Sequence, residues 1–568
     1  MKGTLKKYWG YDSFRPKQEE IISSVLAGRD TLAILSTGGG KSICFQVPAM
    51  MREGICIVVS PLIALIKDQV LNLRRRGIKA LAIHSGMTRN DIDITLDNAA
   101  YGDYKFLYVS PERLKTPLFK ARLEKMDVSM LVVDEAHCIS QWGYDFRPDY
   151  LDIVKVRQLL PSGTPCVALT ATATPVVAKD IMIRLGFPEE NIIRSGFERP
   201  NLSYIFRRVE DKMGQLLGVC QGVAGSGIVY VSKRKNAEDL ARFLRSQDIP
   251  AEGYHAGMDA ASRSLIQERW ISGETRVIVS TNAFGMGIDK ADVRFVCHYD
   301  MPDSLEGYFQ EAGRAGRDGR KAFAVLLWND HDIKRLRQIN SVTFPPLDYI
   351  KEVYQMVHRY LDIPYECGAG QSRKFDVEDF AKHFKLHSAS AYYAIKYIEQ
   401  SGYWTLSDEL EIPSRMRFAI SRDSLYKVQM NDRELDTFIK VIMRIYTGVF
   451  NGYVSIDEER IARLGHYAVD VVKERLKQLA GMHVVVYIPR FRATLLNLSG
   501  ERLTEDNFRL PQSEYDERVS RHRNRLEAMI ELCEDDSECR VTRMLHYFGQ
   551  EDAEPCGNCD VCRGSSQN

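Results

Sequence analysis

The sequence predicts an α/β protein in which two tandem parallel-sheet domains are followed by helical, winged-helix-like segments and a small cysteine-bearing module. Three observations support this fold class. Short apolar runs alternate with longer helical patterns through about residue 330, which is the order of strand–helix units in a parallel sheet. Beyond about residue 335, long helical stretches end in short β-rich pieces. Closely spaced cysteines lie near the C-terminus.

The composition is that of an ordinary globular protein. The chain has 568 residues, of which 45% are hydrophobic and 27% charged. This excludes wholesale disorder, and the length is enough for about four domains. Lysine and arginine number 77 against 76 acidic residues, so any basic track for nucleic acid must be local.

The sequence pattern shows no membrane or export signal. The longest apolar run, 55–66, contains Ser60 and Pro61 and is shorter than the roughly 20 residues of a membrane-spanning helix. The first residues, MKGTLKKYWGYDSF, have no apolar stretch after their lysines, unlike a secretory signal. We therefore expect a cytoplasmic protein with no membrane partner. Its 12 cysteines are then thiols or metal ligands rather than disulfides.

The two α/β domains are predicted from apolar runs of strand length, most of which precede a turn and a helical pattern. We assign residues 1–200 to the first domain and residues 201–335 to the second. The runs of the first domain are 31–36, 55–60, 105–110, 130–135 and 166–172. Those of the second domain are 227–232, 276–281, 295–300 and 322–328.

Two later segments, 376–406 and 455–488, follow one pattern. Each predicts a helix, a turn, an amphipathic helix, a glycine and a β piece, which is the order of a winged helix-turn-helix. The alternative is a pair of helical hairpins that only pack against their neighbours, because periodicity alone does not separate the two. The predicted regions are 336–425 and 426–525 (winged-helix-like), 526–563 (the cysteine-bearing module) and 564–568 (a disordered tail).

A glycine-rich loop follows the first predicted strand. Its residues are Thr37, Gly38, Gly39, Gly40, Lys41 and Ser42. Backbone N–H groups of such a loop curl around phosphate oxygens, and the helix that follows adds partial positive charge. Lys41 would reach the β- and γ-phosphates, and Ser42 would ligate Mg²⁺. Because Leu35 replaces the first glycine of the strict motif, a simple turn is the alternative.

Two carboxylates end another predicted strand, in the sequence Asp134-Glu135-Ala136-His137. This position suits a site for a metal ion and a water molecule. Asp134 would hold Mg²⁺, and Glu135 would orient or deprotonate the attacking water. The alternative is a solvated acidic turn, which the phosphate loop upstream disfavours.

Together the ordered motifs resemble the RecQ helicases of superfamily 2. They are TGGGKS, DEAH with CISQWGYDFRPDY (138–150), and QEAGRAGRDG (310–319). The resemblance covers about residues 5–330 and 529–563. It implies two RecA-like domains and an ATP-dependent helicase that moves 3′ to 5′ on single-stranded DNA and unwinds forked duplexes in repair and recombination. It also implies ATP and Mg²⁺ as cofactors, and a single-stranded-DNA-binding protein is a candidate partner.

The resemblance assigns roles to further residues near the predicted nucleotide site. The stretch WGYDSFRPKQ (9–18) resembles the family's adenine-recognition element. Tyr11 would then stack on the base, and Arg15 and Gln18 would contact base and phosphate. His137 resembles a residue that couples the nucleotide to the rest of the motor, and the alternative is a hydrogen-bonded cleft histidine.

The stretch after the acidic pair carries the strongest indication of DNA. Trp142, Phe146 and Arg147 place two aromatics and a cation in one short loop, a combination that stacks on unpaired bases and pairs with phosphate. The alternative is a hydrophobic loop packed under the sheet. The stretch resembles the family's aromatic-rich loop, which senses single-stranded DNA and licenses ATP hydrolysis. Tyr144 stands where a histidine is expected.

The second domain would supply positive charge to ATP. Arg314 and Arg317 are three residues apart and lie on one face if the segment is helical; alternatively they bind backbone carbonyls. By resemblance, Arg317 is the arginine finger, and Arg314 and Gln310 line the same cleft. In STNAFGMGIDKADV (280–293), Thr281 would contact a DNA phosphate and Asp289 would lie in the cleft.

Four cysteines predict a zinc site. Cys539, Cys556, Cys559 and Cys562 follow the spacing C-x16-C-x2-C-x2-C, and four sulfurs at about 2.3 Å suit tetrahedral Zn²⁺. A redox C-x-x-C is the alternative. Cys533 competes with Cys539 as the fourth ligand, and the resemblance of 539–550 to the RecQ zinc module favours Cys539.

The order of the last segments departs from the family. In typical RecQ proteins the zinc module directly follows the second motor domain and precedes a winged helix. Here the zinc module is relocated to the C-terminal end, after the winged-helix-like segments. The stretch 484–492, with a β-run and two arginines, is a candidate for the strand-separating wing, and an internal strand is the alternative.

Two other functions compete with a DNA helicase. The same motor could act on RNA, which the resemblance of the loop 142–147 disfavours. Alternatively, the chain could be a non-enzymatic DNA-binding module, which the complete set of Lys41, Asp134, Glu135 and Arg317 disfavours.

Overall fold

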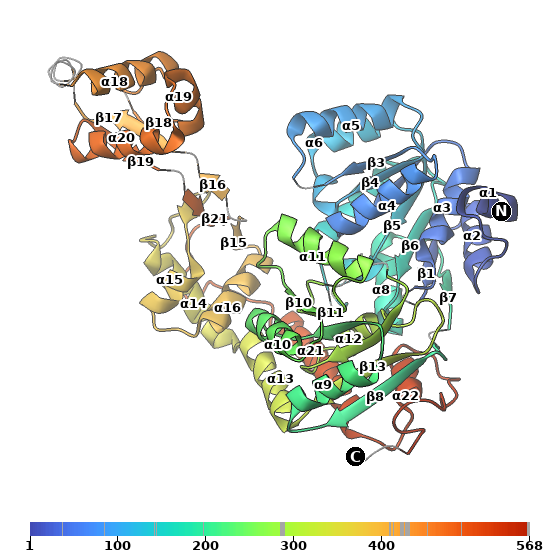
Figure 1. Ribbon diagram of the computed structural model, residues 1–568. Helices are drawn as coiled ribbons and strands as arrows, with labels where there is room; N and C mark the ends of the chain where they lie inside the picture. The colour runs from blue at the N-terminus through green and yellow to red at the C-terminus, as the bar shows by residue number, and fades with distance from the viewer. Residues whose placement is uncertain are drawn as a thin grey trace. The chain divides into compact units, whose positions relative to one another are not determined.

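The chain forms two units in the computed structural model, and each is described by itself. One unit comprises Met1–Arg337 together with Ser520–Asn568, and the other is Gln338–Val519 (Figure 1). The predicted fold class is confirmed, because two parallel-sheet α/β lobes are accompanied by helical segments and a cysteine cluster. The structure describes residues 1–36, 38–84, 86–140, 142–143, 145–196, 198–284, 290–407, 410–412, 414–420, 425, 432–450, 452–489 and 491–564.

The first lobe is built on a seven-stranded parallel sheet with the order β3-β4-β2-β5-β6-β1-β7. All six residues of β5 are buried, as expected for a strand covered by helices on both faces. Since the strands are parallel, the loops after β1 and β5 open at the same edge of the sheet. The strands are β1 (Thr31–Ile34), β2 (Ile55–Val59), β3 (Ala80–Ile83), β4 (Phe106–Val109), β5 (Val128–Val133), β6 (Cys166–Thr170) and β7 (Ile192–Arg194).

Helices of the first lobe begin and end at residues suited to those positions. Before α8, the Thr174 side chain accepts a hydrogen bond from the Val177 N–H, Pro175 is the first helical residue, and Gly186 ends the helix in a left-handed conformation. The helices are α1 (Lys2–Trp9), α2 (Gln18–Leu26), α3 (Lys41–Met51), α4 (Ile63–Arg75), α5 (Arg89–Tyr101), α6 (Pro117–Leu123), α7 (Asp152–Leu159) and α8 (Pro175–Leu185), with short 3₁₀ turns at η1 (Pro111–Arg113), η2 (Ala136–Ile139) and η3 (Pro148–Leu151).

The second lobe repeats the scheme with a six-stranded parallel sheet in the order β10-β11-β9-β12-β13-β8. Strand β8 is therefore an edge strand. The strands are β8 (Leu202–Arg208), β9 (Ser226–Tyr230), β10 (Ala251–Tyr254), β11 (Val277–Ser280), β12 (Val293–His298) and β13 (Ala322–Trp328). The helices are α9 (Lys212–Gly222), α10 (Arg234–Ser246), α11 (Ala260–Ser272), α12 (Leu305–Ala312) and α13 (Asp330–Thr343).

The second unit contains two hydrophobic cores. Helices α14 (Leu347–Tyr360), α15 (Val377–His383) and α16 (Ser388–Gln400) enclose the first, in which Tyr354 stacks on Trp404 and Phe508. Its sheet has the order β14-β21-β15, so β21 returns from far along the chain to pair with strands on either side of it. These strands are β14 (Ser372–Lys374), β15 (Trp404–Leu406) and β21 (Leu495–Leu498).

The second core is therefore nested, in sequence, inside the first. Its helices are α18 (Arg433–Ile445), α19 (Glu458–Gly465) and α20 (Val469–Gly481), and its sheet is β18-β17-β19. Its strands are β17 (Arg415–Phe418), β18 (Val454–Ser455) and β19 (Val485–Ile488), while β16 (Leu410–Ile412) pairs with β20 (Phe491–Ala493). The β-run of the candidate wing forms β19, paired with β17, and Arg490 lies outside the described residues.

The last helices belong to the unit of the two lobes. Helix α21 (Gln512–Glu534) enters this unit at Ser520, and α22 (Arg540–Tyr547) follows it. Arg337 at the end of the second lobe pairs with Glu527 of α21 at 3.2 Å, and α22 lies near β8 (Figure 1). In the sequence, the second unit is thus an insertion between Arg337 and Ser520. This explains how a zinc module placed late in the sequence packs against the second lobe in space.

Within the described residues, no helix combines the length and apolarity needed to cross a bilayer.

Candidate functional site

The glycine-rich loop connects β1 to α3 at the open edge of the first sheet. Gly38 and Gly40 have φ angles of 80° and 76°, which favour glycine because a side chain is strained there. A Cβ on Gly39 would come within 2.9 Å of the Ser36 carbonyl oxygen. Lys41 opens α3 directly after the loop. The loop therefore presents backbone N–H groups and a helix N-terminus, as a phosphate site requires. Thr37 lies outside the described residues.

Two side chains from the start of the chain contact this loop. Arg15 donates a hydrogen bond to the Gly38 carbonyl, and Gln18 Nε2 donates to the carbonyls of Gly39 at 3.2 Å and Gly40 at 3.1 Å. A Cβ on Gly40 would lie 2.5 Å from Gln18 Nε2, so the contact needs glycine. Tyr11 is exposed and lines a cavity that Lys41 and Ser42 also line.

The acidic pair lies at the end of β5, facing Lys41. Lys41 Nζ is 3.7 Å from Glu135 Oε1, and Ser60 Oγ donates to Asp134 Oδ2 at 3.4 Å. Glu135 has a φ of 47°, a conformation uncommon for a residue with a side chain. His137 Nδ1 is 3.0 Å from Thr170 Oγ1. Ser60 and Thr170 were not among the predicted site residues, since neither stands in a motif that specifies its partner.

The two carboxylates differ in their electrostatics. Burial and the charge of Glu135 raise the pKa of Asp134 to about 6. Burial favours the neutral form of Glu135 too, but the neighbouring Lys41, His137 and Arg314 together outweigh it, and the pKa of Glu135 lies below its ordinary value. Burial lowers the pKa of His137, so its ring is neutral near pH 7. Glu135 is thus ionised and able to accept a proton, while a cation beside Asp134 would favour its charged form.

The second lobe places positively charged side chains beside the phosphate loop and the acidic pair. Gln310 lies on α12, and Arg314 and Arg317 follow in the turn after it. All three line one cavity of about 770 Å³ together with Lys41, Ser42, the acidic pair, Tyr11, Arg15 and Gln18. A Cβ on Gly38 would lie 3.2 Å from Arg317 Cγ. The guanidinium groups of one lobe therefore face the phosphate loop of the other.

The residues predicted to contact DNA lie outside the lining of this cavity. Arg147 pairs with Asp145 at 3.0 Å and donates to the Pro61 carbonyl at 3.4 Å. Trp142 and Phe146 are partly buried, and Thr281 follows β11 with its side chain largely buried. Asp289 and Tyr144 lie outside the described residues.

The four predicted cysteines form one cluster. Their sulfurs lie within 4.8 Å of one another, and Cys539 Sγ is 3.5 Å from Cys556 Sγ and 3.8 Å from Cys559 Sγ. Tetrahedral zinc with bonds of about 2.3 Å requires sulfurs about 3.8 Å apart, so the donor set fits Zn²⁺. Cys533 is outside this cluster, and burial raises the pKa of its thiol, as expected for a packed side chain.

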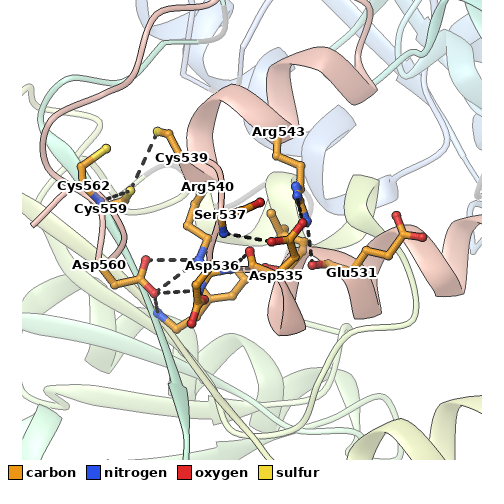
Figure 2. A network of polar contacts seen from close by, with 12 residues as sticks. Glu531, Asp535, Asp536, Ser537, Cys539, Arg540, Arg543, Cys559, Asp560 and Cys562 are labelled. Atoms are coloured by element: carbon orange, nitrogen blue, oxygen red, sulfur yellow. Dashed lines mark hydrogen bonds and ion pairs between the residues drawn. The ribbon is translucent and has the colours of Figure 1, made fainter. Parts of the chain in front are cut away.

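A buried ion pair attaches the cysteine cluster to the second lobe. Arg540 is 3% exposed, contacts Asp560 at 3.1 Å and places its guanidinium carbon 4.8 Å from the centre of the Phe206 ring. Asp560 accepts a hydrogen bond from the Phe206 N–H and donates its own N–H to the Tyr204 carbonyl of edge strand β8. Figure 2 shows Asp560 and Arg540 beside the cysteines. The loop that carries Cys559 and Cys562 therefore docks on β8.

Comparisons with known proteins relate the sequence around these sites to known helicases. Family models match the chain at four places: DEAD/DEAH box helicase at 15–181, helicase conserved C-terminal domain at 210–319, RecQ helicase winged-helix domain (Bacteroidota) at 416–489, and RecQ zinc-binding at 499–563. The probable ATP-dependent DNA helicase RecS of Bacillus subtilis (strain 168) is 38% identical over 383 residues, which are 65% of this chain and 77% of that protein. The chain belongs to the RecQ family of helicases.

In other RecQ relatives, the part that matches this chain is a smaller share of the relative's length. The ATP-dependent DNA helicase RecQ of Pasteurella multocida (strain Pm70) is 42% identical over 336 residues, or 59% of this chain and 53% of that protein. The RecQ-like DNA helicase blm-1 of Caenorhabditis elegans is 36% identical over 492 residues, or 82% and 47%. The chain thus spans about half the length of several curated RecQ relatives.

Family membership also bears on the zinc centre and the inserted unit. The RecQ zinc-binding match includes the cysteine cluster. The family match and the close spacing of the four sulfurs therefore both support Zn²⁺ over a redox pair. The RecQ winged-helix match covers the helices and strands of the second core, where the pattern of 455–488 predicted a winged helix. In the first core, α15, α16 and β15 follow the helix–turn–helix–strand order predicted for 376–406.

Proposed function

We propose that this RecQ-family chain hydrolyses ATP in the cavity between its lobes and uses the cycle to move 3′ to 5′ on single-stranded DNA, unwinding forked duplexes in repair and recombination. The observation that supports this most is the convergence of two charge sets on one cavity. Lys41 and the acidic pair approach from the first lobe, and Arg314 and Arg317 from the second.

The residues divide the chemistry between them. Lys41 and the N–H groups of Gly38–Gly40 bind the phosphates. Ser42 and Asp134 would hold Mg²⁺, which neutralises charge on the β- and γ-phosphates when bound. Glu135, ionised and 3.7 Å from Lys41, orients the attacking water and accepts its proton. Arg317, helped by Arg314 and Gln310, stabilises the charge that develops on the transferred phosphoryl group.

Base recognition and coupling complete the proposal. Tyr11 stacks on adenine, while Gln18 and Arg15 link the base to the phosphate loop that they already contact. Thr37 and Asp289 remain predicted contacts of the nucleotide. His137 relays the state of Glu135, its neighbour at 3.5 Å. Closure of the lobes around ATP and reopening after hydrolysis would advance one strand.

The DNA contacts are proposed from the aromatic loop and from β11. Trp142 and Phe146 would stack on unpaired bases, and Arg147 and Thr281 would contact phosphates. A single-stranded-DNA-binding protein is a proposed partner, because unwinding produces the strand that such a protein covers. We propose the cytoplasm as the location of this work.

A lysine variant tests the proposal most directly. Lys41→Ala should abolish ATP hydrolysis, because the phosphates lose their cation, while the thermal unfolding temperature stays near that of the wild type. The assay is ATP turnover with single-stranded DNA, with RNA and without nucleic acid. Full turnover in Lys41→Ala would refute the site. Stronger stimulation by RNA would favour an RNA motor, and binding of DNA without turnover would favour a non-enzymatic module.

Unwinding itself requires a second assay. Forked duplexes carrying either a 3′ or a 5′ single-stranded tail should be separated, with ATP present, only when the 3′ tail is available for loading. Separation from the 5′ tail alone would reverse the proposed direction.

A further inference from the structure

Helix α21 contacts the aromatic loop that follows the acidic pair. The guanidinium carbon of Arg521 lies 3.1 Å from the centre of the Trp142 ring. One turn further along the helix, Arg525 Nη2 donates a hydrogen bond to the Trp142 backbone carbonyl. One arginine therefore covers the ring of Trp142, and the next holds its backbone.

The aromatic loop, which begins at Trp142, packs closely against the segment that follows the acidic pair. The Trp142 N–H donates to Ser140 Oγ at 3.1 Å, and the Gly143 N–H donates to the Ser140 carbonyl at 3.0 Å. A Cβ on Gly143 would lie 2.5 Å from the His137 carbonyl oxygen. With so little space between them, a displacement of Trp142 acts on the segment that holds His137 and Glu135.

Arg525 also contacts the second lobe. Arg525 Nε is 3.9 Å from Glu306 Oε1, in the first turn of α12. Tyr547 of α22 donates to the same oxygen at 2.9 Å, and the Phe548 ring lies 5.1 Å from that of Phe309. Glu306 is 3% exposed, so its attraction to Arg525 is little screened by water. Helix α12 carries Gln310 and leads to Arg314, which places Arg525 between the aromatic loop and the arginine-bearing turn.

We propose that Arg525 is a positioning residue that links DNA at the Trp142 loop to the arginines of the second lobe, with Arg521 holding the ring in the DNA-free state. A base that stacks on the face of Trp142 competes with Arg521, since both bind the π-face of the indole. The loop then moves, and Arg525 carries the movement of the Trp142 carbonyl to Glu306 and α12. The inference rests on the proposed function and extends it to residues of the zinc-bearing segment.

A purely structural role for Arg525 makes a different prediction. If the arginine only docks α21 on the lobes, its loss lowers stability and zinc retention along with activity. If it relays DNA occupancy, its loss lowers the DNA-stimulated kcat while the nucleotide KM, the zinc content and the thermal unfolding temperature stay unchanged.

The test compares Arg525→Met with Arg523→Met in the full-length, zinc-loaded chain. Arg523 is on the same helix and exposed, so its variant should match the wild type. ATP turnover is measured against the concentration of an oligo(dT) strand. We expect Arg525→Met to lose about tenfold in DNA-stimulated kcat, a typical size for coupling between sites. Full stimulation in this variant would overturn the proposal, as would lost stimulation accompanied by zinc loss or a lowered unfolding temperature.

A second variant tests whether Glu306 is the other end of the link. Glu306→Gln removes the charge while keeping an acceptor for Tyr547. Its effect should not add to that of Arg525→Met, because both variants break one contact; additive losses would overturn the link. A wild-type chain with no DNA-stimulated turnover would overturn both this inference and the proposed function. A stimulated wild type with an unaffected Arg525→Met would overturn the inference alone.

Discussion

The zinc centre and the nucleotide cavity both gather polar side chains around a ligand, but they draw on very different lengths of chain. The four zinc ligands span Cys539 to Cys562, whereas the cavity combines residues from Leu5 to Arg317 across two lobes. The zinc centre is formed by one short segment whose four sulfurs lie close together, so it depends on its ion. The cavity depends on two separate sheets, because each lobe supplies part of its lining.

Removal of zinc should therefore give the largest effect and confine it to one side of this comparison. Structural zinc in small modules contributes about 10–16 kcal/mol of folding free energy, so chelation should unfold the residues that follow α21. Hydrogen exchange should show lost protection in α22 and at edge strand β8, to which Asp560 donates. Binding of a fluorescent ATP analogue to the first lobe should persist. Protection of α22 that survives complete zinc loss would show that the ion is dispensable.

Loss of the arginine finger should instead affect the nucleotide cavity and leave the zinc centre intact. Arg317→Ala should lower ATP turnover about 10³-fold or more, since such arginines contribute about 10³–10⁵ in rate. Zinc content and unfolding temperature should not change, because the Arg317 side chain lines the cavity rather than a core. Arg320→Ala, at an exposed position nearby, is the matched control. Equal turnover in the two variants would remove Arg317 from the catalytic set.

The comparison also explains what the sequence could predict. The phosphate loop, the acidic pair and the cysteines are each local, and local backbone geometry requires their glycines and spacings. The nesting of the second core inside the first could not be predicted, because β21 pairs with strands that lie about a hundred residues earlier in the chain. The contact of Arg521 with Trp142 joins residues far apart in sequence, and nothing in either neighbourhood specifies the other.

The next largest effect should come from the buried pair that joins the zinc loop to β8. Arg540→Met leaves the carboxylate of Asp560 buried without its guanidinium, and breaking such a pair costs about 3–5 kcal/mol. The zinc-bearing segment should unfold at lower temperature and release zinc faster to a chelator. Arg543, also drawn in Figure 2, pairs with Asp535 at a more exposed place, so Arg543→Met should have a smaller effect. The reverse order would show that the docking on β8 is not what stabilises the zinc centre.

The smallest effect should separate two serines that occupy equivalent positions on neighbouring strands. Ser60 follows β2 and Ser110 follows β4, and their preceding residues, Val59 and Val109, are paired in register. Ser60 donates to Asp134, whereas Ser110 donates to Glu112 at 2.7 Å. Of these two serines, Ser60 is therefore the one that orients a carboxylate of the cavity.

Ser60→Ala should raise the Mg²⁺ concentration needed for half-maximal ATP hydrolysis by a few fold, because a typical hydrogen bond contributes about 0.5–1.5 kcal/mol and this one is long, at 3.4 Å. Ser110→Ala removes an equally buried hydroxyl and should leave the Mg²⁺ dependence unchanged. If both variants shifted it equally, the effect would come from packing at the ends of the strands. If only Ser60→Ala shifts it, Asp134 is held in place by a residue to which the sequence assigned no part in the cavity, and the cavity is organised by the sheet as much as by its signature sequences.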